Sequence, residues 1–341
     1  MSAERGDAHD DRTAPVEAAE AAAAVTGLDD DTARRIVGEV VSRVGTVVDG
    51  KDDVITLAAV VLLAEGHLLV EDVPGVGKTV LARAFAKAIG GRVSRIQFTP
   101  DLLPSDVTGV TTYHRDTSRF EFVPGPVFAN IVIGDEINRA SPKTQSALLE
   151  CMAERQVTVD GTSHPLPRPF TVFATQNPIE MEGTFPLPEA QRDRFMARVS
   201  MGYPDVDSEA ALVAARARRN PLDALEPVTD ARQFALVVAR VHEVFVADAV
   251  TRYAVDLVRA TREHPEVRVG ASPRATLHLV HAARALAFVS GRGFVVPEDV
   301  IGLADAVLAH RLVLADRGAD EREALRIVAE CRASVPVPRG R

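Results

Sequence analysis

The sequence has 341 residues, only two cysteines and no tryptophan. Cys151 and Cys331 lie far apart and form no C-x-x-C pair, so we predict neither a disulfide framework nor a zinc site. The nine histidines are scattered without the spacing of metal ligands. We therefore expect two free thiols in a protein of the reducing cytoplasm.

Long apolar runs and basic blocks are also missing. The longest apolar run, residues 56–65, is far too short to span a bilayer. The first segment, MSAERGDAHDDRTAP, resembles neither a signal nor a transit peptide. The formal net charge is −9, and no cluster of lysine and arginine stands out. These absences predict a cytoplasmic protein without membrane insertion, and they argue against nucleic acid as a partner.

The most informative segment is HLLVEDVPGVGKTVLAR, residues 67–83. An apolar run leads into Pro-Gly-Val-Gly-Lys-Thr, and an Ala/Leu-rich helical pattern follows. This order of strand, glycine loop and helix is typical of a phosphate-binding P-loop. The glycines let backbone N–H groups turn toward an anion, at the positive end of the following helix. We expect Lys78 to reach the β- and γ-phosphates of ATP, and the Thr79 hydroxyl to hold Mg²⁺.

One position departs from the P-loop pattern. The pattern G-x-x-x-x-G-K-[ST] requires glycine at position 72, where this chain has Asp72. Gly75 and Gly77 remain and permit the close approach of backbone to phosphate, so we predict that the loop still binds nucleotide. The predicted nucleotide-binding residues are Asp72, Val73, Pro74, Gly75, Val76, Gly77, Lys78, Thr79 and Val80.

Hydrophobic periodicity divides the chain into four parts. Residues 1–31 lack core-forming side chains and predict a disordered, acidic and Ala-rich tail, followed by a helix capped at Asp31-Thr32. Strands alternate with helices over residues 32–203, with hairpin patterns at 107–123 and 156–169. Residues 204–333 predict helices alone, and 334–341 a second tail. The expected fold class is an α/β domain followed by an all-α domain. The expected helices of the second domain are 208–219, 231–247, 249–263, 273–289, 297–310 and about 320–331.

A second motif follows an apolar run at residues 131–134, which is typical of a parallel strand buried on both faces. It ends in Asp135 and Glu136. A P-loop requires an aspartate at the tip of a neighbouring strand to help hold Mg²⁺, and Asp135 is placed for this. Glu136 points to the other side of the backbone and could activate water as a general base. A strand that ends in two solvated acids is the alternative.

Asn177 ends the next predicted strand, so it is expected beside the same crevice of a parallel sheet. A neutral amide can orient an attacking water there. The side chain could equally begin the Asn-Pro turn that follows. The residues alone leave both interpretations open.

Several long phrases occur in order: the P-loop, DEINRASPKTQSALLECMAERQVTVDG, ATQNPIE and LPEAQRDRF. Together they resemble the MoxR family of AAA+ ATPases, and the resemblance covers about residues 32–315. It implies an AAA+ core with a parallel five-stranded sheet between helices, two β-hairpin inserts and an α-helical lid. It also implies Mg-dependent ATP hydrolysis in a hexameric ring. The activity implied is chaperone-like remodelling or maturation of partner protein complexes, often with von Willebrand factor A domain proteins.

The resemblance assigns roles to the motif residues. Lys78 and Thr79 match Walker A, while Asp135 and Glu136 match Walker B. Asn177 matches sensor 1, which favours the water-orienting interpretation of this residue. The two hairpins match inserts that face the ring pore or a partner.

Two arginines complete the implied site. Arg194, in the phrase DRF, matches the arginine finger, which acts in trans at the neighbour's γ-phosphate. Taken alone, it could be an exposed loop arginine. Nearby Arg192 could compete for this role or simply lie at the surface. Arg274, in SPR, matches sensor 2 in the first turn of a lid helix, from which it is expected to reach back toward the phosphates. An arginine on a solvated helix face is the alternative.

Four other residues have two interpretations each. Tyr113, His114 and Phe120 on the first hairpin could contact a partner or pack within the chain. Gln97 ends the second predicted strand. It could hold Glu136 away from water until a partner binds, or be an ordinary polar strand end.

Three other functions fit a P-loop. A nucleic-acid-associated AAA+ motor is disfavoured by the charge of −9 and by the absence of a basic cluster. A nucleotide-switched scaffold would bind ATP tightly with little turnover. A small-molecule kinase would have no obvious use for the helical domain and the two hairpins.

Overall fold

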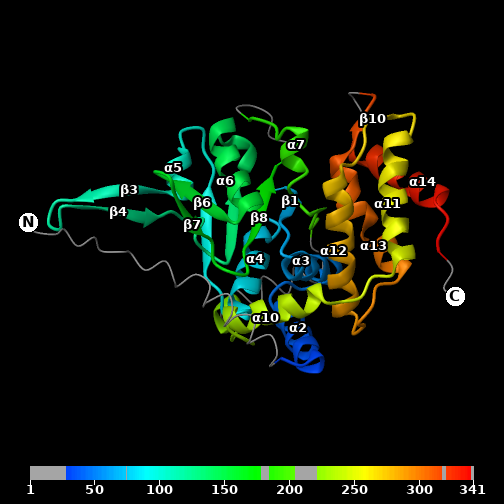
Figure 1. Cartoon of the computed structure of the whole chain (residues 1–341), viewed down its shortest axis with the longest axis horizontal. Helices are drawn as coiled ribbons and strands as arrows, with labels where there is room; N and C mark the ends of the chain where they lie inside the picture. Colours follow the sequence, from blue (N-terminus) through cyan, green and yellow to red (C-terminus); the bar gives the residue numbers. More distant parts are fainter. Residues whose placement is uncertain (1–27, 74, 178–183, 204–220, 317–319, 339–341) are drawn as a thin grey trace, which may run out of the picture.

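The computed structural model describes residues 28–73, 75–177, 184–203, 221–316 and 320–338. The predicted helix at 208–219, most of the predicted N-terminal tail and Pro74 lie outside these residues. A central sheet with flanking helices forms one side of the molecule, and a helical lid forms the other (Figure 1). No helix of the described ranges is long and apolar enough to cross a membrane.

The central sheet has five parallel strands in the order β2-β5-β8-β1-β9, which confirms the predicted α/β core. Strand β5, whose apolar run predicted burial on both faces, is buried along its whole length, and β8 is buried along almost all of its length. All five carboxyl ends meet at one edge of the sheet, where the P-loop and the acidic motif lie. The strands are β1 (Leu68–Glu71), β2 (Val93–Gln97), β5 (Ile131–Asp135), β8 (Thr171–Gln176) and β9 (Ala197–Val199).

Alternating side chains place a core on each face of the sheet. Leu68 and Val70 belong to the core with α2 (Asp30–Gly45), α3 (Asp52–Leu63) and α4 (Lys78–Ala88).

The intervening Leu69 belongs to the opposite core, with α6 (Pro142–Glu154). Ser141 caps helix α6 and accepts from the Thr144 N–H at 3.3 Å. Helix α2 begins earlier than expected. Its cap is Asp29, which accepts from the Thr32 N–H at 2.7 Å.

Both predicted hairpins are present. Strands β3 (Gly109–His114) and β4 (Arg119–Pro124) form one, which extends away from the body of the molecule (Figure 1). Strands β6 (Gln156–Val159) and β7 (Thr162–Pro165) form the other, next to α6. Short helices α5 (Pro104–Thr108) and α7 (Glu189–Arg192) lie in the connections.

The first hairpin carries an exposed aromatic pair. Tyr113 and Phe120 face each other across the strands, with ring centroids 5.1 Å apart and exposed fractions of 49% and 74%. They therefore pack on each other and not into either core.

The lid contains mainly helices, as predicted, and one small sheet that was not. Strands β10 (Val267–Val269) and β11 (Val313–Leu314) pair antiparallel and correct the all-α expectation. Strands this short leave no alternation that a sequence pattern can reveal. The helices are α9 (Pro221–Ala224), α10 (Ala231–His242), α11 (Asp248–Glu263), α12 (Pro273–Val289), α13 (Pro297–Leu308) and α14 (Glu321–Ser334), with the 3₁₀ turn η3 (Ala309–Arg311).

Helix α10 lies beside α2 and α3 of the core and also contacts α12. The segment just before it is tied to the core as well, because the Val228 N–H donates to the Ala88 carbonyl at 2.8 Å. The lid therefore contacts the core through α10 and through the segment before it. The domain boundary at residues 203–204 stays a prediction.

Candidate nucleotide-binding site

The loop between β1 and α4 turns on two glycines. Gly75 and Gly77 have φ angles of +90° and +96°, in the left-handed region where other residues are strained. Gly77 is also the residue before the first turn of α4. The first N–H groups of α4 and the positive end of its dipole therefore face the loop, which is the arrangement that binds phosphate.

Lys78 connects the P-loop with the acidic strand end. Its Nζ donates to the Asp72 carbonyl oxygen at 2.8 Å. Burial lowers the pKa of the amine, and the carboxylates of Asp72, Asp135 and Glu136 oppose that shift. Strands β1 and β5 both pair in parallel with β8, so the P-loop and the acidic pair lie at the same end of the sheet. The two motifs predicted to share a site lie together in the fold.

Asp72 anchors the start of the P-loop. Its side chain is buried, and Oδ1 accepts from the Val73 N–H at 2.9 Å. Oδ2 accepts from Ser200 Oγ at 3.0 Å and from the Gly202 N–H at 2.6 Å. The aspartate that replaces glycine at this position therefore links the end of β1 to the segment after β9. The hydrogen bond of Lys78 goes to the Asp72 carbonyl and not to this carboxylate.

Thr175 of β8 holds the acidic pair together. Its hydroxyl donates to Asp135 Oδ1 at 3.3 Å and accepts from the Glu136 N–H at 3.0 Å. Asp135 Oδ2 accepts from Arg95 Nε at 2.6 Å. Sequence reasoning missed both Thr175 and Arg95. Only their positions could have indicated them, because each lies on a strand that pairs with β5.

Glu136 leaves the strand in a left-handed conformation, with φ of +58°. Its Oε2 accepts from Gln97 Nε2 at 2.9 Å and pairs with Arg139 Nη1 at 3.3 Å. The predicted contact between Gln97 and Glu136 is present. The role suggested for this contact stays a prediction.

Asn177 follows the last residue of β8 and is buried. Its neighbour Gln176 accepts the Asp72 N–H at 3.2 Å, so the strand end lies beside the start of the P-loop. Mg²⁺ prefers hydroxyl and carboxylate oxygens as ligands. Thr79, in the first turn of α4, and Asp135 supply such oxygens at this edge, and the residues present therefore fit the ion.

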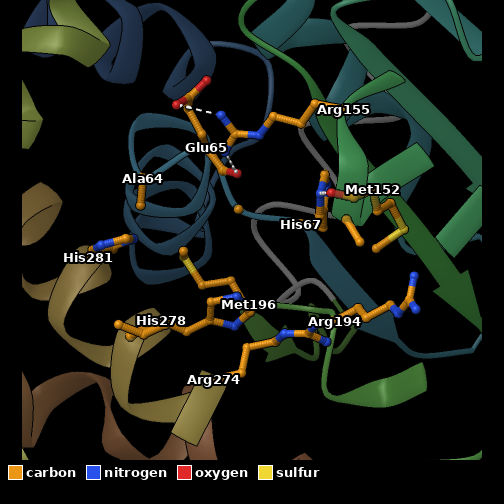
Figure 2. A pocket seen from close by; sticks show the side chains of 13 residues that line it. Ala64, Glu65, His67, Met152, Arg155, Arg194, Met196, Arg274, His278 and His281 are labelled. Carbon is orange, nitrogen blue, oxygen red and sulfur yellow. Dashed lines mark hydrogen bonds and ion pairs between the residues drawn. The ribbon is translucent and has the colours of Figure 1, made fainter. Parts of the chain in front are cut away.

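The predicted arginines lie at the opposite edge of the sheet. Arg194 and Arg274 line a cavity of about 250 Å³ together with His67, which immediately precedes β1 (Figure 2). The P-loop follows the other end of β1, which at about 3.3 Å per residue is roughly 13 Å away. Within one chain, Arg274 therefore lies beside Arg194 and does not reach back toward the phosphates. The sequence-based expectation for Arg274 is therefore corrected. It failed because the sequence does not indicate how the lid is oriented relative to the core.

Arg192 and Arg194 open onto different cavities. Arg192 lines a cavity of about 770 Å³ with Arg198 and Arg268, along the edge strand β9. Arg194 shares its cavity with Arg274, and its Nη1 donates to the Leu149 carbonyl. The two arginines, two positions apart in the sequence, thus lie in different environments, and Arg274 lines only the cavity of Arg194.

His67 is a buried neutral histidine at the wall of the smaller cavity. Its Nδ1 accepts from the Val172 N–H at 3.0 Å, so the ring proton is on Nε2, which donates to the Met152 carbonyl at 3.1 Å. Burial lowers the pKa of His67 to about 4. The ring therefore links β1, β8 and α6 without carrying charge at neutral pH.

His67 predicts a loss of stability in acid. The folded pKa of about 4 lies below the ordinary value of 6.5, so the unfolded chain takes up the proton first. The stabilisation is complete above pH 6.5 and is lost as the pH falls to 4, by about 3 kcal/mol. Urea denaturation across this range measures the free energy of unfolding. Wild type should lose more of it than His67→Gln, whereas His114→Gln on the exposed hairpin should follow wild type. Equal losses in all three proteins would contradict the assignment.

Comparisons with known proteins agree with this geometry. A family model described as "ATPase family associated with various cellular activities (AAA)" matches residues 67–197, and one described as "AAA lid domain" matches residues 259–330. The chain is 48% identical over 304 residues to "Uncharacterized protein YeaC" of Bacillus subtilis, covering 89% of this chain and 95% of that protein. It is 45% identical over 285 residues to "Chaperone MoxR1" of Mycobacterium tuberculosis, covering 81% and 75%. The crystal structure of a candidate ATPase from Cytophaga hutchinsonii has a TM-score of 0.83 at 36% identity, covering 95% of this chain and 99% of that one.

Proposed function

The chain belongs to the MoxR family of AAA+ ATPases, and from this premise we propose that it couples Mg-dependent ATP hydrolysis to the remodelling or maturation of a partner protein complex. One observation carries the proposal. Strands β1 and β5 both pair in parallel with β8, which brings Lys78 of the P-loop and the Asp135-Glu136 pair to the same end of the sheet. A phosphate-binding loop and a pair of acids at one sheet edge are the parts that ATP hydrolysis requires.

Each residue at the carboxyl edge has a task in this proposal. Residues 72–80 bind the nucleotide, with the phosphates at the start of α4 and on Lys78. Thr79 and Asp135 hold Mg²⁺, which neutralises phosphate charge when bound. Glu136 takes the proton from the attacking water, and Asn177 orients that water.

Gln97 supplies a resting state in the proposal. It holds the Glu136 carboxylate at 2.9 Å in the isolated chain. A partner that draws Gln97 away would free Glu136 to act as the base. This arrangement would keep turnover low until the partner is engaged.

The separation of the arginines from the P-loop supports a hexameric ring. Arg194 and Arg274 lie at the amino edge of the sheet, so they would serve the nucleotide of the next subunit. Their charges would stabilise the transition state in trans. Every complete site would then need two subunits.

The partner is proposed to be a protein. "Chaperone MoxR1" is a relative, and chaperone activity acts on protein clients. The extended β3–β4 hairpin, with its exposed Tyr113 and Phe120, offers a surface for such a client. Proteins with a von Willebrand factor A domain are the proposed class, and the cytoplasm is the proposed location.

The test is turnover of Mg-ATP by wild type and Glu136→Gln. Removing the base should lower kcat by at least about 100-fold while ATP still binds. Glu150→Gln, on the exposed surface of α6, is the matched control and should retain activity. The proposal would be contradicted if wild-type protein shows no turnover in any oligomeric state, or if Glu136→Gln is active. Tight ATP binding with negligible turnover even when partner is present would instead favour a nucleotide-switched scaffold.

A further inference from the structure

A buried arginine of the lid holds the loop that contains Arg194. The side chain of Arg311 is only 1% exposed, and its Nε donates to Asp193 Oδ1 at 2.9 Å. Its Nη2 donates to the Phe195 carbonyl at 2.6 Å and to the Asp193 carbonyl at 3.3 Å. Its Nη1 donates to the Met196 carbonyl at 3.2 Å. One lid side chain therefore binds both sides of the Arg194 position.

Asp193 also holds the first turn of α12. Both of its carboxylate oxygens lie 2.9 Å from Ser272 Oγ. Ser272 is the N-cap of α12 and accepts from the Arg274 N–H at 3.1 Å. The Arg274 guanidinium lies 3.8 Å from Asp193 Oδ2. The residue before Arg194 is thus bound to the cap of the helix that carries Arg274.

His278 adds a further link between Arg311 and α12. Arg311 Nη2 donates to His278 Nδ1 at 2.6 Å, which places the ring proton on Nε2. His278 lies four residues after Arg274, on the same side of the helix, and lines the same cavity (Figure 2). Arg311 is therefore bonded to α12 directly as well as through Asp193.

The charges make this cluster hard to rearrange. Arg311 is buried and Asp193 is 17% exposed, so separating them would leave a charge without its partner in a poorly hydrated place. Such a loss typically costs several kcal/mol. The Arg194 loop and the start of α12 are accordingly expected to move as one body.

We propose that Arg311 is a positioning residue for ATP hydrolysis, which holds Arg194 and Arg274 as one unit against the nucleotide of the next subunit. This inference rests on the proposed function. Both guanidinium groups would then reach the phosphates, or leave them, in a single movement of the lid. A misplacement of about 1 Å at a catalytic group can lower a rate about 100-fold. Arg311 contributes by preventing such a misplacement, without touching ATP.

The test compares Arg311→Lys with a matched lid arginine. Arg292 also pairs with an aspartate, at 2.5 Å from Asp299, but within the described part of the chain its hydrogen bonds and ion pairs reach none of residues 193–196. Arg311→Lys should lower kcat at least about tenfold, with KM, affinity for a fluorescent ATP analogue and ring assembly within about twofold of wild type. Arg292→Lys should leave all four quantities within about twofold.

A background without the two cavity arginines separates positioning from a general structural role. Since Arg311 acts through Arg194 and Arg274, Arg311→Lys should cost little when both of them are replaced by alanine. If the two losses multiply, or if Arg292→Lys costs as much as Arg311→Lys, the inference is wrong. Asp193→Asn replaces Arg311→Lys if the latter does not fold, as judged by circular dichroism. If neither Arg311→Lys nor Asp193→Asn folds, Arg311 has a purely structural role and the inference is wrong.

The two proposals fail in different ways. Inactive wild-type protein, or an active Glu136→Gln, condemns the proposed function. If turnover depends on Glu136 but Arg311→Lys has the same kcat as wild type, only the inference about Arg311 is contradicted.

Discussion

An equal mixture of Arg194→Ala and Glu136→Gln subunits is expected to regain ATP turnover that neither variant has alone. Arginine fingers contribute about 10³-fold or more to such reactions, so each pure variant should be nearly inactive. In a mixed ring, a site is complete when its P-loop subunit retains Glu136 and the next subunit retains Arg194. Random assembly completes about a quarter of the sites. Turnover of the mixture should therefore approach about a quarter of the wild-type rate.

The neighbouring arginine provides the control. Arg192 lines the larger of the two cavities, whereas Arg274 lines the smaller one together with Arg194. Arg192→Ala should therefore remain active by itself. Recovery must depend on mixing before the rings form, and the steady-state release of phosphate measures it. An active pure Arg194→Ala, or a mixture as inactive as its components, would refute a finger supplied by the neighbour.

Replacing Asp72 by glycine is expected to destabilise the protein, although it completes the P-loop pattern. The carboxylate accepts from the Val73 and Gly202 N–H groups and from Ser200 Oγ. An intramolecular hydrogen bond contributes about 1 kcal/mol net, and a buried donor left alone costs free energy. Glycine would also add freedom to the unfolded chain. We expect the free energy of unfolding in urea to fall by about 3 kcal/mol.

Ser200→Ala is the graded control, because it removes only one of the three donors. It should cost about 1 kcal/mol. We also expect Asp72→Gly to bind ATP no more tightly than wild type, since the entry to the loop loses its anchor. A glycine variant as stable as wild type would show that the three hydrogen bonds contribute nothing net.

The segments predicted best are those whose parts are contiguous in sequence. Residues 67–83 contain a strand, a glycine loop and a helix start, and each has its own local signature. The uninterrupted apolar run before Asp135 placed that strand inside the sheet, where the structure has it. The Gln97–Glu136 contact followed from two parallel strands that end at one edge.

The unpredicted features depend on distant pairs. Asp193 and Arg311 are 118 positions apart, and no local pattern indicates that a lid arginine is buried against that aspartate. The position of Arg274 required the direction in which the lid packs, which helix periodicity does not contain. Asp72 was a mismatch to a motif until its partners, Ser200 and Gly202, were known.

The Asp72 anchor has a mechanical consequence. Gly202 is followed by Tyr203, whose carbonyl accepts from Lys51 Nζ at 3.0 Å, so the chain is clamped from two sides where it leaves the sheet. The clamp lies directly before the predicted domain boundary. A displacement of the phosphate loop would therefore carry residues 200–203 with it, because these residues are tied to Asp72 on one side and, through Lys51, to the start of α3 on the other.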